Sequence, residues 1–145
     1  MTQKIIFGIG ILIGLLFFKK TKPIILKQIL IGLLVCYLLG LLNNQFTNTI
    51  GYVGLGILSL IFGIYSIFKK LWLNTLIGFF TSITIIHGIM NWPFYREMQL
   101  IMIIPIICYL ILCVNWKKYL NSFSISTILS FYMATLFINL LSKWI

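Results

Sequence analysis

Long, uninterrupted apolar runs constrain this chain more than any other feature. Five of them have about the 17 to 25 residues needed to cross a bilayer, and they cover residues 24–42, 50–68, 71–90, 98–114 and 122–141. Within each run the apolar residues are continuous and do not alternate with polar ones, which favours a helix over a barrel strand. A helix also satisfies its own backbone hydrogen bonds in lipid. The runs therefore predict an all-α, polytopic membrane protein.

A sixth apolar run is shorter than the others. As a helix, residues 5–18 rise about 21 Å, against a hydrocarbon core of about 30 Å. An extension through residues 2–4, with flanking lysines that reach the headgroups, would let this run cross as well. Alternatively, the run lies in the membrane interface. We predict six transmembrane helices, or five if the first run does not span. The loops are short, so consecutive helices are expected to be antiparallel neighbours.

The composition agrees with a membrane protein of one domain, residues 1–145. Hydrophobic residues make up 61% of the chain and charged residues 8%, whereas a soluble domain carries roughly a quarter charged residues. The lipid bilayer is therefore the predicted partner. A net charge of +10 would suggest nucleic acid in a soluble protein. Here the lysines stand in ones and twos between apolar runs, which is typical of membrane topology, so we expect no nucleic-acid partner.

The distribution of basic residues predicts the orientation. Along six spans, alternate sides of the membrane receive eight and three of the eleven basic residues. The side with eight carries Lys19, Lys20, Lys22, Lys27, Lys69, Lys70, Lys117 and Lys118. The positive-inside rule places these in the cytoplasm or an organelle matrix, with both chain termini outside. We expect a multi-pass protein of the bacterial inner membrane, with an organellar inner membrane as the alternative.

The fourth run, with the turn that follows it, is the most polar of the six. On a helix over residues 71–91, two neighbouring arcs carry Asn74, Thr81, Thr84, His87 and Asn91. A polar stripe of this width is expected to face protein or water rather than lipid. One interpretation is hydrogen bonding between helices, at roughly 0.6–2 kcal/mol per bond. The other is the wall of a pore or substrate cavity. We rank the first interpretation ahead.

The rarest side chains gather in one corner, at the end of the fourth run and just after it. His87, Arg96 and Glu97 are the only histidine, the only arginine and the only acidic residue of the chain. One histidine and one glutamate do not make a zinc or haem ligand set, and a lone carboxylate cannot act as half of an acid–base pair. The three cysteines lie inside apolar runs, without a CxxC pair. We therefore expect no cofactor, no metal and no enzymatic activity. We interpret Arg96 and Glu97 as polar residues at the outer membrane–water interface.

The corner also carries a local resemblance. The segment of residues 89–101 resembles a helix-turn-helix corner in small bacterial inner-membrane proteins related to the membrane subunit of the type 9 secretion and gliding motor. Met90, Trp92, Pro93 and Met98 match that pattern. Gly88 and Asn91 stand where the family has lysine and histidine, and its intramembrane carboxylate has no counterpart. The resemblance implies the geometry of the corner and does not imply the proton-driven activity.

Small residues and one proline lead to further expectations. All eleven glycines lie in the first four runs, and Ser122, Ser126 and Ser130 recur every fourth residue in the sixth. Such spacings let helix backbones approach closely, so we interpret them as packing surfaces. Pro105 lies in the middle of the fifth run and is expected to bend that helix.

Together these features favour a non-enzymatic integral membrane subunit of a larger inner-membrane assembly. The short loops and the absence of room for an extramembrane domain support this interpretation. The alternative is a small oligomeric transporter or channel in which the helix over residues 71–91 lines the pathway. Partners would be other membrane subunits or further copies of the same chain.

Overall fold

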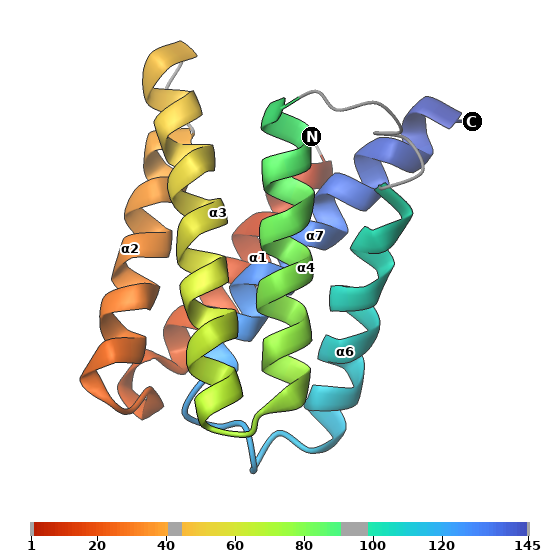
Figure 1. The fold of residues 1–145 in the computed structure, drawn as a ribbon. Coiled ribbons are helices and arrows are strands. Elements are labelled where there is room, and N and C mark those ends of the chain that lie inside the picture. Colours follow the sequence, from red (N-terminus) through yellow and green to blue (C-terminus); the bar gives the residue numbers. More distant parts are fainter. Residues whose placement is uncertain (1, 41–44, 91–98, 145) are drawn as a thin grey trace.

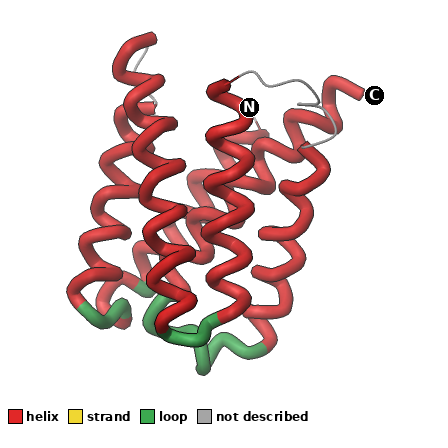
Figure 2. The backbone as a smooth tube through the Cα atoms, in the orientation of Figure 1, coloured by secondary structure: helices red, strands yellow, loops and turns green. Residues whose placement is uncertain are grey.

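The computed structural model describes residues 2–40, 45–90 and 99–144 of the 145-residue chain. All regular secondary structure in these segments is helical (Figures 1 and 2), as the apolar runs predict. In chain order the elements are α1 (Thr2–Leu16), η1 (Phe18–Lys20), α2 (Ile24–Gly40), α3 (Gln45–Phe68), α4 (Trp72–Met90), η2 (Gln99–Met102), α6 (Ile103–Val114) and α7 (Phe123–Trp144), where η marks a 3₁₀ helix. The predicted extension of the first helix through residues 2–4 is present.

Three helices of the described segments, α3, α4 and α7, are long and apolar enough to cross a membrane. The other three are shorter: α1 has 15 residues, α2 has 17 and α6 has 12. At 1.5 Å per residue, α2 rises about 26 Å and α6 about 18 Å, which is less than the roughly 30 Å hydrocarbon core. By length and composition, the chain is consistent with a membrane protein.

The helices form a bundle in which α7 is the central element. α7 packs against α1, α2, α4 and α6, and every residue from 122 to 130 is buried. α2, α3 and α4 follow one another as antiparallel neighbours (Figure 1), and the α3–α4 contact is the most extensive in the bundle. The loops between η1 and α2, α3 and α4, and α6 and α7 all lie at one end, at the bottom of Figure 2.

α1 departs from the expectation that consecutive helices are neighbours. It packs mainly against α7, more than a hundred residues away, and makes no extensive contact with α2. The reason is a matching surface, because a Cβ added at Gly10 would meet Phe131, and one added at Gly14 would meet Ile128. Ser124 Oγ also donates a hydrogen bond to the backbone oxygen of Gly14. The glycines of α1 therefore form a packing surface, as predicted, but for a partner that loop length does not indicate.

Pro105 lies in the first turn of α6 rather than in the middle of a helix. The run over residues 98–114 is divided into the 3₁₀ helix η2 and the α-helix that begins at Ile103. Proline is well tolerated in a first turn, where N–H groups lack an intrahelical partner. The mid-helix proline on which the predicted bend depends is therefore not found, and the helix type changes before Pro105 instead. The Pro105 carbonyl accepts a hydrogen bond of 3.4 Å from Ser130 Oγ of α7.

Candidate functional site

The polar residues of α4 face protein, as the stripe predicts. Asn74 and Thr81 are fully buried, and Thr84 and His87 are 7% and 5% exposed. α4 packs against α3, α6 and α7, and its exposed face carries apolar residues such as Ile83 and Ile86. The remaining candidate residues, Asn91, Arg96 and Glu97, lie outside the described residues, as does most of the corner that they form.

Asn74 connects α4 to the start of α7. Its Nδ2 donates a 2.6 Å hydrogen bond to Ser122 Oγ, and its Oδ1 accepts one of 3.0 Å from Ser126 Oγ. Ser122 Oγ in turn donates to the backbone oxygen of Tyr119, at 3.2 Å. Both ends of the amide are thus used within the bundle. At this end of α4 the stripe serves hydrogen bonding between helices.

The middle of α4 carries two buried hydroxyls that, unlike the Asn74 amide, make no hydrogen bond to another described residue. Thr81 and Ser82 are fully buried, and neither hydroxyl oxygen has a hydrogen-bond partner among the described residues. A buried hydroxyl without a partner costs roughly 1–3 kcal/mol relative to a satisfied one. Burial of these two hydroxyls therefore lowers the stability of the bundle.

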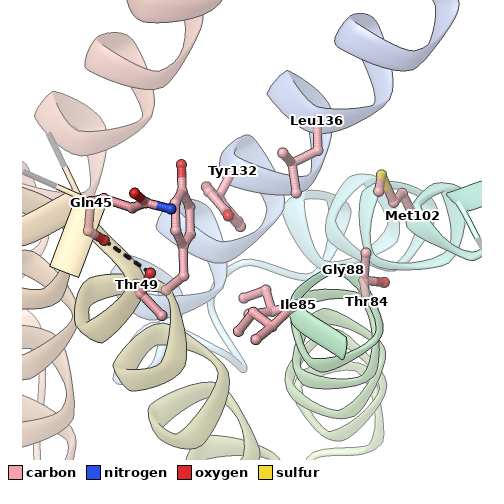
Figure 3. Close-up of a pocket in the computed structure, with 10 residues that line it drawn as sticks. Gln45, Thr49, Thr84, Ile85, Gly88, Met102, Tyr132 and Leu136 are labelled. Carbon is pink, nitrogen blue, oxygen red and sulfur yellow. Dashed lines mark hydrogen bonds between the residues drawn. The ribbon is translucent and has the colours of Figure 1, made fainter. Parts of the chain in front are cut away.

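A cavity of about 520 Å³ lies beyond them, at the end of α4 opposite the lysine-bearing loops. Side chains of α3, α4, η2 and α7 form its wall, and they are Gln45, Thr49, Tyr52, Thr84, Ile85, Gly88, Ile89, Met102, Tyr132 and Leu136. Figure 3 shows Gln45 and Thr49 on one side of the cavity and Thr84, Ile85 and Gly88 of α4 on another, with Tyr132 and Leu136 contributed by α7.

The wall of this cavity combines polar and aliphatic groups. Thr84 Oγ1 donates to the backbone oxygen of Phe80 at 2.8 Å, and Thr49 Oγ1 donates to that of Gln45 at 2.9 Å. Two phenol rings and an amide complete the polar part, beside isoleucine, leucine and methionine side chains. Small-molecule sites usually measure about 300–1,000 Å³ and combine apolar walls with a few polar groups. The cavity is suited to an amphipathic small molecule.

Sequence reasoning identified only part of this wall. Of the predicted residues, Thr84 lines the cavity, while Asn74 lies at the opposite end of α4 and bonds to α7. Gln45, Thr49, Tyr52 and Tyr132 were missed. The available signal for Gln45 and Thr49 was the polar segment before the apolar run over residues 50–68, which the structure makes the start of α3.

The described segments contain no arrangement of side chains suited to metal binding. No group of three or more histidine, cysteine or acidic side chains there is close enough to hold a metal ion. The thiols of Cys36, Cys108 and Cys113 are free, and each lies within an apolar helix.

Comparison with known proteins gives no match, whether to a family model, a curated protein or a solved structure. The similarity of residues 89–101 to the motor-related membrane proteins therefore stays a prediction.

Proposed function

We propose that this protein is a non-enzymatic integral membrane subunit of a larger assembly in the bacterial inner membrane. In this proposal all six apolar helices span the membrane, and both termini lie outside. The observation that carries it is the use of polar side chains inside the bundle. Several of them bond one helix to another, whereas the outward faces of the helices are largely apolar.

Five hydrogen bonds illustrate this use of polar groups. Besides the Asn74 bonds, Ser124 of α7 bonds to α1, Ser130 of α7 bonds to α6, and Tyr109 of α6 and Thr127 of α7 lie 2.9 Å apart, oxygen to oxygen. Fully buried apolar side chains, including Phe62, Ile77, Ile125 and Leu129, form one hydrophobic core in the same bundle. A bundle packed in this way resembles a structural unit more than an open pathway.

The outward faces supply the surface for partners. Leu12 of α1, Val35 of α2 and Leu110 of α6 are 65%, 49% and 61% exposed, and their neighbours on the same faces are also aliphatic. Lipid or another transmembrane helix can cover such a face. The short helices α2 and α6 would also gain from a neighbour, because a hydrophobic length below the bilayer thickness favours association.

Site-specific photo-crosslinking in intact cells tests the subunit proposal. A photoreactive amino acid is placed at Leu12, Val35 or Leu110, with the fully buried Leu33 as the control position. We expect one face to give a discrete product with a different membrane protein, identified by mass spectrometry, while Leu33 gives none. If all three faces yield only lipid adducts, the subunit proposal is wrong.

The cavity between α3, α4 and α7 favours a second candidate, a small oligomeric transporter. Crosslinks formed only between copies of the chain would favour it. In liposomes, such a transporter would release a trapped small organic solute. Thr84→Trp, which fills the cavity, should abolish that flux, whereas Ile83→Trp on the exposed face of α4 should not.

A further inference from the structure

A second cavity, of about 470 Å³, lies at the opposite end of the bundle, where three loops meet. Its wall consists of Lys22, Pro23, Leu26, Tyr65, Lys69, Leu71, Lys118, Asn121 and Ser122. The three lysines come from three different connections: the one before α2, the one after α3 and the one before α7. Segments far apart in the sequence thus bring three lysines to the wall of one cavity.

The chain itself can offer little negative charge to these lysines. It contains eleven basic residues and a single acidic one. The nearest partners that the structure gives two of the lysines are aromatic rings. Lys69 Nζ lies 6.0 Å from the centre of the Tyr65 ring, and Lys118 Nζ lies 5.7 Å from that of Tyr119. Most of the counter-charge at this cavity must therefore come from another molecule.

The backbone adds to the positive potential. Pro23, Leu71 and Ser122 all line the cavity, and their carbonyl oxygens accept the first i→i+4 hydrogen bonds of α2, α4 and α7, from Lys27, Thr75 and Ser126. The cavity therefore lies at the starts of three helices, where the macrodipoles are positive. Proline and leucine have no side-chain oxygen for capping, which leaves first-turn N–H groups of α2 and α4 for an external acceptor.

Apolar groups lie beside the charged ones. Leu26 of α2, Leu71 before α4 and the ring of Tyr65 form part of the same wall. We propose that this cavity binds an anionic phospholipid, with the phosphate among Lys22, Lys69 and Lys118 and the first acyl carbons against Leu26 and Leu71. Basic hollows between transmembrane helices are suited to such headgroups. A free phosphate would use the lysines but not the apolar wall.

The test uses the full-length protein, purified in a neutral detergent and titrated with lipid. Native mass spectrometry should show one tightly bound phosphatidylglycerol and far weaker binding of phosphatidylcholine. The variant Lys22→Gln/Lys69→Gln/Lys118→Gln should bind phosphatidylglycerol at least about tenfold more weakly, because each lysine near a headgroup contributes measurably to its affinity. The matching triple Lys→Arg variant keeps the charge and should bind normally, which distinguishes lost binding from misfolding.

The matched control removes the same charge from the same end of the bundle. Lys19, Lys20 and Lys117 are exposed and lie outside the cavity wall. Their triple change to Gln should alter the affinity by less than about threefold, since these three lysines do not line the cavity. Equal weakening in both triple variants would mean general attraction to an anionic surface and would overturn the site. Stabilisation and mass adducts with inorganic phosphate alone, but not with phosphatidylglycerol, would overturn the lipid as its occupant.

Discussion

The side chain of Asn74 joins α4 to the start of α7 through both of its polar ends. Replacing it with Ala removes the bonds to Ser122 and Ser126 and leaves both hydroxyls buried. We expect the free energy of unfolding to fall by about 1–3 kcal/mol. Thermal unfolding in detergent measures this, with the exposed Gln28→Ala as the control. In a double-mutant cycle, Asn74→Ala and Ser126→Ala should be non-additive, and simple additivity would contradict the bond.

Lys70 lies in the turn that ends α3, where the backbone adopts a left-handed conformation. It adopts a φ of 54°, and its N–H and that of Leu71 bond to the carbonyls of Ile67 and Ser66, both at 2.9 Å. This is the Schellman arrangement, in which glycine is favoured at the left-handed position. Lys70→Gly should stabilise the protein by about 1 kcal/mol, because only glycine adopts this φ without steric cost. Lys70→Ala removes the charge but keeps a Cβ, so an equal gain there would contradict the explanation.

At the scale of elements, α3 and α4 approach most closely at a pair of glycines. A Cβ at Gly78 would lie 2.6 Å from the backbone nitrogen of Gly63 and 2.7 Å from the Ser59 oxygen. Since backbone atoms cannot move aside, Gly78→Ala must separate the helices, at about 1–3 kcal/mol. Gly8→Ala is the control, because nothing lies within 4 Å of its added Cβ. It should be neutral or slightly stabilising, and a comparable loss there would show that the contact is not the cause.

The sequence predicted these elements better than their pairing. Continuous apolar runs identified the helices, and the glycine spacing identified the packing surfaces of α1 and α3. The pairing of α1 with α7 was not predictable, because it depends on shape between Gly10, Gly14 and Ile128, which are distant in the sequence. The change of helix type before Pro105 was also missed. A proline marks an irregularity, but the neighbouring turns determine whether it becomes a bend or a helix start.

The two cavities belong to the scale of the whole molecule, which is why the sequence indicated them only in part. Each forms where residues from three or more elements meet. The stripe on α4 supplied Thr84 of one cavity, and positive-inside counting grouped Lys22, Lys69 and Lys118 on one side. The sequence pattern could not show how close these lysines lie to one another. Lysines on one side of a membrane can be scattered, and the fold brings three of them to the starts of α2, α4 and α7.

The arrangement of the whole molecule leads to a prediction about topology. The three loops that carry lysine pairs share one end of the bundle, and α3 begins at the other end. In single-cysteine variants, an impermeant thiol reagent should therefore label Lys70→Cys and Lys118→Cys only from the cytoplasmic side. Gln45→Cys should be labelled only from outside. The direction follows from the eight lysines at the loop end, which the positive-inside rule keeps in the cytoplasm.

Whether the N-terminal helix α1 crosses the membrane decides between six spans and five. α1 runs antiparallel to α7, with Gly10 near Phe131 and Gly14 near Ile128, so it follows a helix of spanning length instead of lying across the bundle end. A reporter fused before Met1 should accordingly be found outside, on the side of Gln45. A reporter inside the cytoplasm, with Gln45 still outside, would mean that α1 lies in the interface and that five helices span. Labelling of Gln45 and Lys70 from the same side would contradict both arrangements, because α3 could then not cross the membrane.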